Sequence, residues 1–314
     1  MTLPLMKQCL QLVVIGLLNV CLTRGATHKD LQSQMVSIAP TASDAVIPIS
    51  YWTDVQDPQT HLLRVTSGVL GTGFLIDEHG DFVTAAHVVK NKDAAPREGL
   101  LNWRLTAVLR QKSGDGAGMP FSVIETDLDH DLALCHIDNF HATPLAANPL
   151  SKMPLPTGKG SLSLAQMVRP FASLGISKRL PAIGHLNLVC GFPLGSWTPT
   201  VQLGLVSALE TVYPPESPVH RVPKDSRELL QISVNANHGN SGGPVIDLQS
   251  GEVLGVILEA VPAPLQIQGL QLYDQQSFAM SGITLAAPAS WINRLLEKHK
   301  ITSRCIRTGR LTIW

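Results

Sequence analysis

Residues 73–87 have the sequence GFLIDEHGDFVTAAH, in which two apolar runs flank a polar turn. The runs cover 74–76 and 82–83, and the turn between them ends at Gly80, a residue suited to a tight reversal. This arrangement predicts a β-hairpin with strands at 73–77 and 81–84. Two small alanines follow, so the chain can turn sharply off the second strand at His87.

The same two-residue period recurs along most of the chain, in place of the 3.6-residue period of helices. Residues 102–110 largely alternate polar and apolar side chains, as a strand with one buried face does. Further strands are expected at 121–124, 132–137, 186–190, 201–209, 229–234, 245–247, 253–258 and 282–285. Many short strands between Gly, Pro and Asp turns indicate an all-β protein built of barrels or sandwiches. A helix is expected near the C-terminus, where Ser290 could cap it and Ile292, Leu295 and Leu296 share one face.

The composition excludes several classes of protein. The 314-residue chain is 44% hydrophobic and 15% charged, with 24 Lys and Arg residues balancing 24 Asp and Glu residues. Disordered chains are more polar and more highly charged, so a loop-rich globular protein is indicated. A neutral chain also lacks the positive field that holds a polyanion, which argues against nucleic-acid binding.

The first residues have the pattern of an export signal. Lys7 precedes an apolar run at 9–22, and small residues follow it at 25–26. The run is too short to cross a bilayer comfortably, although an uncleaved anchor or a buried helix is an alternative. We therefore expect an extracytoplasmic protein, periplasmic or secreted, with no stable membrane span after cleavage. The cysteines that remain, Cys135, Cys190 and Cys305, are odd in number and form no CxxC motif, so neither a zinc cluster nor a disulfide framework is indicated.

Residues 239–244, with the sequence GNSGGP, carry the strongest chemical signal. Glycines on both sides of Ser241 permit a tight turn that exposes the hydroxyl and gathers backbone amides in one small space. An oxyanion hole needs this geometry, with the amides of Gly239 and Ser241 as donors and that of Asn240 as an additional one. The alternative is a glycine-rich hairpin turn that contains an ordinary serine.

A serine nucleophile needs a base, and the base needs an orienting carboxylate. His87 and Asp131 are the candidates, because each lies at the end of a predicted strand; taken singly, either could instead be structural. They occur in the order His, Asp, Ser, the chain order of chymotrypsin-type enzymes. A cleft between two strand-rich halves would collect all three.

The sequence resembles the trypsin-like serine endopeptidases of the HtrA (DegP-like) branch. The matching motifs are GTGFLI at 71–76, TAAHVV at 84–89, DLAL at 131–134, LGLVSA at 203–208, GNSGGP at 239–244 and residues 278–288. The resemblance implies a pair of six-stranded antiparallel barrels with a C-terminal helix. It also implies that His87 is the general base, Asp131 its orienting carboxylate and Ser241 the nucleophile, with an oxyanion hole formed by the amides of Gly239, Asn240 and Ser241.

The expected organisation follows from the motifs and the Pro-rich region between the halves. It comprises a signal peptide at 1–26, an N-terminal extension at 27–60, a first barrel at 61–140, a connector or insertion at 141–184, a second barrel at 185–288 and a helix with a basic tail at 289–314. Few residues follow Lys298, so the peptide-binding PDZ domain of many HtrA-like enzymes is not expected. His238 stands where the family commonly has proline, and we expect it at the rim of the site.

Substrate preference rests on the positions that match the pocket of the family. Asn235 stands at the pocket base, so a buried acid that would neutralise Lys or Arg is absent there. Leu258, Glu259 and Ala260 match the wall that binds the substrate backbone. Together these residues predict cleavage of polypeptides after small or medium uncharged residues, unless Glu259 points inward.

The predicted function is that of a serine endopeptidase that needs no metal or organic cofactor and acts on polypeptides in extracytoplasmic turnover or processing. A catalytically silent peptide-binding or chaperone module is one alternative, and a narrow-target protease or esterase is another. The sequence leaves the oligomeric state open.

Overall fold

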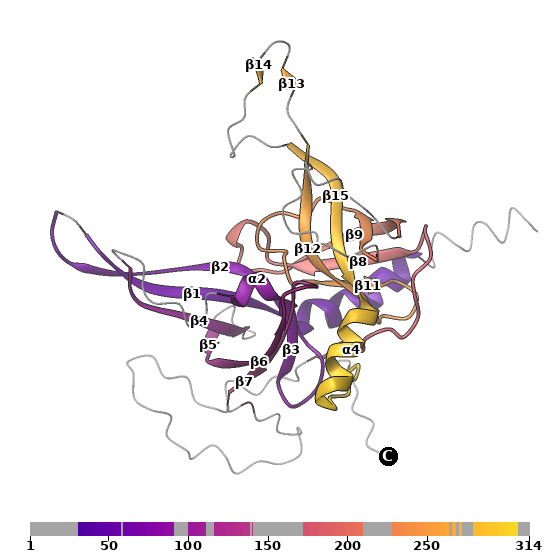
Figure 1. The fold of residues 1–314 in the computed structure, drawn as a ribbon, viewed down its shortest axis with the longest axis horizontal. Coiled ribbons are helices and arrows are strands. Elements are labelled where there is room, and N and C mark those ends of the chain that lie inside the picture. Colours follow the sequence, from indigo (N-terminus) through magenta and orange to yellow (C-terminus); the bar gives the residue numbers. More distant parts are fainter. Residues whose placement is uncertain are drawn as a thin grey trace, which may run out of the picture. The chain divides into compact units, whose positions relative to one another are not determined.

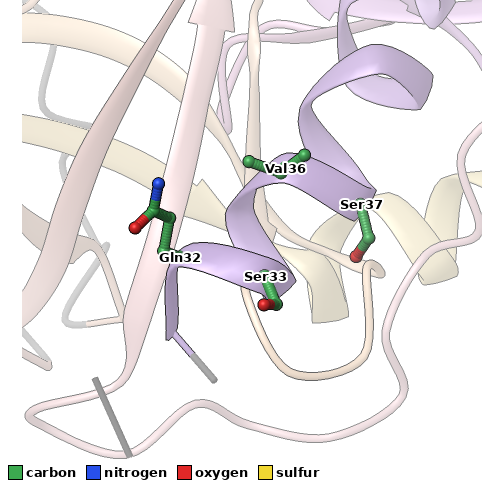
Figure 2. A pocket seen from close by; sticks show the side chains of 4 residues that line it. All are labelled: Gln32, Ser33, Val36 and Ser37. Atoms are coloured by element: carbon green, nitrogen blue, oxygen red, sulfur yellow. The ribbon is translucent and has the colours of Figure 1, made fainter. Parts of the chain in front are cut away.

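The computed structural model describes residues 31–57, 59–90, 100–110, 116–138, 140, 172–209, 228–263, 266–267, 270–271 and 279–306 (Figure 1). The chain divides into two units, residues 1–40 and residues 41–314. Residues 31–45 are helical. A pocket on this helix is lined by Gln32, Ser33, Val36 and Ser37 (Figure 2). It contains neither an acid nor a base, so it offers none of the chemistry that the sequence predicts.

The larger unit begins with a seven-stranded antiparallel sheet in the order β5-β4-β1-β2-β3-β7-β6. Its strands are β1 (Val46–Gln56), β2 (Leu63–Leu75), β3 (Asp81–Ala85), β4 (Leu100–Arg110), β5 (Gly116–Met119), β6 (Phe121–Asp127) and β7 (Leu132–Ile137). β1 and β2 form a long hairpin whose far end extends past the neighbouring strands (Figure 1). The near end of β2 is buried, which places the sheet's core around Phe74, Leu75 and Phe82.

A closed barrel follows, in the order β10-β15-β12-β11-β8-β9. Its strands are β8 (Leu186–Gly191), β9 (Thr200–Ala208), β10 (Leu230–Ser233), β11 (Pro244–Asp247), β12 (Val253–Ala263) and β15 (Ala279–Pro288). Val189, Val206, Ile232, Val245 and Ala286 fill its interior. Two short strands, β13 (Gln266–Ile267) and β14 (Leu270–Gln271), form a separate small sheet.

Short helical segments join the sheets to the functional loops. α2 (Ala86–Val89) continues directly from β3, and a 3-10 turn, η2 (Pro193–Gly195), follows β8. α4 (Ala289–His299) continues from β15 and buries Trp291, Ile292 and Leu295. Its last residues, Lys298 and His299, both bind the Glu125 carboxylate on β6, so a helix that begins at the barrel is tied to the first sheet.

The predicted architecture of two β-barrel units with a C-terminal helix is confirmed, as are the strands that the alternation predicted. The first unit differs in detail, because it has seven strands and forms an open half-barrel. Its strands β5 and β6 are joined through Pro120, which has no amide to add to a ladder. The first sheet also begins at Val46, inside the segment predicted as an extension. The predicted signal peptide and most of the predicted connector lie outside the described residues.

Two further details concern single residues. Ser290 is not the helix cap: Pro288 occupies that position without a side-chain bond, because β15 enters the helix there directly. Cys135 and Cys190 are buried, as their apolar surroundings predicted, and Cys305 is exposed.

Asp77 holds the turn between β2 and β3. Its carboxylate accepts hydrogen bonds from the amides of His79, Gly80 and Asp81, at 2.9, 3.1 and 3.1 Å. Burial, and then the nearby carboxylate of Asp81, raises the pKa of Asp77 above its ordinary value of 3.8. The fold therefore disfavours the charged form of this side chain.

Asp57 holds the turn of the β1–β2 hairpin in the same manner but with the opposite electrostatic result. Its carboxylate accepts the amides of Thr60 and Gln59, each at 2.9 Å, and these bonds lower the pKa of Asp57. The fold therefore favours the charged form at this turn.

Replacing each aspartate by asparagine should give pH responses of opposite sign. Asp77→Asn should raise the free energy of unfolding at pH 7, and the gain should fade as the pH falls through the raised pKa, where the wild type is protonated. Asp57→Asn should lower that free energy at pH 7, and the loss should fade only as the pH falls below 3.8 through the lowered pKa. Urea titrations across this range measure both differences, and two differences of the same sign at pH 7 would contradict the assignment.

Candidate active site

His87 and Asp131 lie together because their strands are neighbours. β3 pairs with β7, opposing Ala85 to Leu132; His87 follows β3 in α2, and Asp131 directly precedes β7. Nδ1 of His87 donates to Oδ2 of Asp131 at 2.6 Å, because a carboxylate can only accept. The amide of His87 donates to Oδ1 at 2.8 Å. Asp131 therefore holds both the ring and the backbone of the histidine.

The backbone of Asp131 has an unusual conformation that makes this pairing possible. Its φ is +53°, in the left-handed region that few residues other than glycine adopt and that aspartate tolerates. In this conformation its carbonyl accepts the amide of Ala86 at 3.0 Å while its carboxylate binds His87. The side chain of His87 keeps 19% of its surface exposed, so the imidazole is not sealed from solvent.

Residues 237–243 form the loop around Ser241, and neighbouring segments fix the carbonyl groups in it. The carbonyl of His238 accepts the amide of Leu194 at 2.6 Å. The next carbonyl, that of Gly239, accepts the hydroxyl of Thr72 at 2.6 Å.

The following two carbonyls are also bound, one from within the loop and one by β2. The carbonyl of Asn240 accepts the amide of Gly243 at 2.9 Å, and that of Ser241 accepts the amide of Thr72 at 2.8 Å. The amide of Asn240 donates back to the carbonyl of Asn237 at 3.0 Å and closes a turn. Asn240, predicted as an additional oxyanion donor, therefore already uses its amide within the loop.

The amides of Gly239 and Ser241, like those of Asn237 and His238 at the start of the loop, have no acceptor among the described residues. The carbonyl and the amide hydrogen of a trans peptide point in opposite directions. Because the carbonyls of residues 238 and 240 are bound by the amides of Leu194 and Gly243, the amides of residues 239 and 241 point away from those two partners. The arrangement provides two donors beside a serine, which is what an oxyanion hole requires.

The turn that creates this arrangement needs glycine at position 239. Gly239 is the third residue of the turn closed by Asn240, with φ +96°, and a positive φ there is the mark of a type II turn. A Cβ at this position would lie 2.1 Å from the carbonyl oxygen of Phe192. Both the backbone conformation and the available space therefore exclude a side chain.

The loop of Ser241 and the helix of His87 meet at one glycine of β2. A Cβ on Gly71 would lie 2.9 Å from the Ser241 carbonyl oxygen and 2.6 Å from a methyl group of Val88, the residue after His87. The Ser241 hydroxyl itself donates to the carbonyl of Leu258 at 3.2 Å rather than to His87. Histidine and serine thus lie on adjoining elements, with the hydroxyl turned toward β12.

The residues predicted for the specificity pocket come from the segment after β10 and from β12, two strands that both pair with β15. Asn235 is exposed, Leu258 is buried, and Ala260 packs partly against the barrel core. Sequence reasoning missed Gly282, where a Cβ would lie 3.6 Å from Oδ1 of Asn235. Its φ of +78° is unusual inside a strand, and an isolated glycine in a strand pattern was the available signal.

In the described part of the chain, no three His, Cys, Asp or Glu side chains gather closely enough to hold a metal ion. The same part contains no helix long and apolar enough to span a bilayer.

Comparison with known proteins agrees with this geometry. Residues 71–256 match the family described as "Trypsin-like peptidase domain". The chain is 29% identical over 238 residues to "Putative protease Do-like 14" of Arabidopsis thaliana, an alignment that covers 76% of this chain and 43% of that protein. It is 27% identical over 266 residues to "Serine protease HTRA4" of Homo sapiens, covering 84% and 41%. The chain thus spans less than half the length of these curated relatives.

Among solved structures, the "HtrA-type protease AlgW with decapeptide" superposes with a TM-score of 0.54 at 17% identity, covering 84% of this chain and 66% of that chain. At this level of identity the likeness supports the fold alone.

The tight docking of the serine loop can be tested at Gly242. This residue has φ +84°, and a Cβ there would lie 2.2 Å from both the Thr72 carbonyl oxygen and Oγ1 of Thr84. Gly184 has a similar φ, +92°, but a Cβ added there would meet nothing within 4 Å, so it serves as the matched control.

Gly184→Ala should lower the free energy of unfolding by about 1 kcal/mol, the cost of placing an L-residue in the left-handed region. Gly242→Ala should cost about 1–3 kcal/mol more, because the methyl group also overfills the interface. Denaturant titration of both variants measures the difference, and equal losses would show that the loop does not dock as described.

Proposed function

The chain belongs to the trypsin-like peptidase family, with relatives among the HtrA and Do-like proteases, and on that premise we propose that it is a serine endopeptidase. The observation that carries the proposal is the serine loop, in which the amides of Gly239 and Ser241 have no acceptor among the described residues and are left as donors. The His87–Asp131 pair supports it from the adjoining element.

The proposed reaction is acyl transfer in two steps. Ser241 Oγ attacks the peptide carbonyl carbon while Nε2 of His87 accepts its proton, and the carbonyl oxygen becomes an oxyanion bound by the amides of Gly239 and Ser241. The tetrahedral intermediate expels the amine, which takes the proton from His87. Water then repeats the sequence on the acyl-enzyme, and the acid product leaves.

Asp131 acts in this scheme through the histidine. Its carboxylate accepts a hydrogen bond from Nδ1–H, so the proton stays on Nδ1 and Nε2 has the lone pair that must take the serine proton. The negative charge of the carboxylate also stabilises the imidazolium that forms. Attack also requires the Ser241 hydroxyl to leave the carbonyl of Leu258, by rotation about χ1, and to donate to His87 instead.

The need for that rotation raises a second candidate function, peptide binding without cleavage. The hydroxyl bonded to Leu258 is the arrangement expected of a protease fold that binds peptides without cleaving them. We favour the enzyme because the two amides remain available, whereas a collapsed site would use them or turn them away.

The proposed setting is protein turnover or processing outside the cytoplasm. One relative, 26% identical over 244 residues, is described as a "Probable periplasmic serine endoprotease DegP-like" of Chlamydia pneumoniae. The export signal predicted at residues 1–26 supports the same compartment, and polypeptides are the proposed substrates.

The first test is labelling of the nucleophile. Wild-type protein should react with a fluorophosphonate probe and cleave denatured casein, whereas Ser241→Ala should lose both activities, with hydrolysis reduced by about 10⁴-fold or more. Ser250→Ala, at an exposed serine in the turn after β11, is the control and should behave as the wild type. Folded wild-type protein that neither reacts nor cleaves would reject the enzyme in favour of the peptide-binding module.

The second test concerns the pocket base. Products of a denatured-protein digest should show cleavage after small or medium uncharged residues, and Asn235→Asp should shift cleavage toward Lys and Arg by adding a carboxylate at the pocket base. Asn237→Asp adds the same charge two residues away and should leave the preference unchanged. A wild-type preference for Arg would contradict the assignment of Asn235.

A further inference from the structure

Thr72, on β2 of the first sheet, makes two hydrogen bonds with the serine loop. It is fully buried. Its amide donates to the Ser241 carbonyl at 2.8 Å, and its hydroxyl donates to the Gly239 carbonyl at 2.6 Å. The same hydroxyl accepts the amide of Phe192 at 3.2 Å. One residue of the first sheet therefore binds two loops of the second barrel.

We propose that Thr72 is a positioning residue that keeps the amides of Gly239 and Ser241 turned into the oxyanion site. The inference rests on the proposed peptidase function and adds to it a residue that never touches the substrate. Its action is indirect, because the Gly239 and Ser241 carbonyls that it binds belong to the peptide groups that directly follow those of the two donors.

The hydroxyl of Thr72 connects the two segments that orient the critical peptide group. The bond that it donates holds the carbonyl of Gly239, inside the serine loop. Its accepted bond fixes Phe192, two residues before Leu194, and the Leu194 amide in turn binds the carbonyl of His238. That carbonyl belongs to the same peptide group as the Gly239 amide, so its orientation sets the direction of the donor.

Loss of the hydroxyl would remove two buried hydrogen bonds, the one that the Gly239 carbonyl accepts and the one that the Phe192 amide donates. Neither group could bond water in its place, because the Thr72 site is closed to solvent. The loop can relieve this penalty if the peptide group between His238 and Gly239 rotates. That rotation would turn the His238 carbonyl toward the oxyanion site and the Gly239 amide away from it. The penalty therefore falls on catalysis as well as on stability.

The surrounding glycines explain why a threonine fits this position. A Cβ at Gly191 would lie 3.0 Å from Oγ1 of Thr72, one at Gly242 would lie 2.2 Å from its carbonyl oxygen, and one at Gly243 would lie 3.5 Å from Cγ2. Two of these glycines thus face the side chain of Thr72, and the third, Gly242, faces its backbone. Because threonine is branched at Cβ and stiff about χ1, the close packing fixes the direction of its hydroxyl.

The test replaces Thr72 by valine, which keeps the shape and removes the hydroxyl, and by serine, which keeps the hydroxyl. Thr72→Val should lower kcat by about 10- to 100-fold with little change in KM, because the lost bonds orient groups that act mainly in the transition state. Thr72→Ser should recover most of the activity.

The affinity for a peptide aldehyde distinguishes a positioning role from a purely structural one, because a loss of stability alone would not weaken aldehyde binding selectively. Ser241 Oγ adds to the aldehyde carbon, the carbonyl oxygen becomes the oxyanion, and the serine proton passes to His87, so no group leaves. Its affinity for Thr72→Val should fall by the same factor as kcat/KM. The affinity for the cleaved peptide product, which needs no oxyanion, should stay near that of the wild type.

Thr106→Val is the matched control, because Thr106 is also a buried threonine whose hydroxyl bonds two partners, Trp52 Nε1 at 3.0 Å and Ser50 Oγ at 3.2 Å. It lies on β4, outside the serine loop, and should lower the melting temperature without a selective loss of kcat. If Thr72→Val does not fold, Thr84→Val takes its place, because the Thr84 hydroxyl holds the carbonyl of Thr72 at 2.7 Å. A smaller loss of kcat and of aldehyde affinity is then expected.

Wild-type kcat and aldehyde affinity in folded Thr72→Val, or in Thr84→Val where that variant replaces it, would overturn the inference. A loss of kcat in Thr106→Val equal to that in Thr72→Val would also overturn it. These outcomes differ from failure of the proposed function itself, which would appear as a folded wild-type protein without hydrolysis or fluorophosphonate labelling.

Discussion

The candidate site depends on one geometric constraint, the opposite directions of the carbonyl and the amide hydrogen in a trans peptide. Two unpaired amides do not persist in a loop by default, because an unpaired buried backbone group costs free energy and the loop would rearrange to pair it. In residues 237–243 the carbonyls of His238 and Asn240 are bound, so the amides of Gly239 and Ser241, which belong to the same peptide groups, point away from those partners. The direction of the two oxyanion donors is therefore determined by the groups that bind the loop carbonyls.

The same constraint explains why the site needs two sheets. The carbonyl partners come from η2 within the second barrel and from β2 of the first sheet, and the histidine and aspartate come from the ends of β3 and β7. Glycine occupies the points of closest approach, since Gly71 and Gly242 have no room for a methyl group. The contacts that pack the first sheet against the second barrel are thus the same contacts that shape the site.

Local patterns predicted the parts of this protein that local physics determines. The bounds of β7 and α4 follow from an apolar run and an amphipathic face, and the motifs around His87, Asp131 and Ser241 follow from turn chemistry. β1 was missed because most of its residues are buried on both faces, which leaves no two-residue alternation. The cap at Ser290 was wrong because strand β15 leads straight into the helix, a tertiary connection that no cap preference describes. The role of Thr72 was out of reach, since its partners lie 167 and 120 positions away in sequence.

The bonds from Thr72 also have a consequence for the order of events during folding. A second barrel that has closed by itself contains the serine and its glycines, but it lacks the strand that binds the Gly239 and Ser241 carbonyls. A half-folded chain would therefore possess a nucleophile without a shaped site. On the proposed function, the newly made protease stays harmless to its own unfolded segments until both sheets have docked.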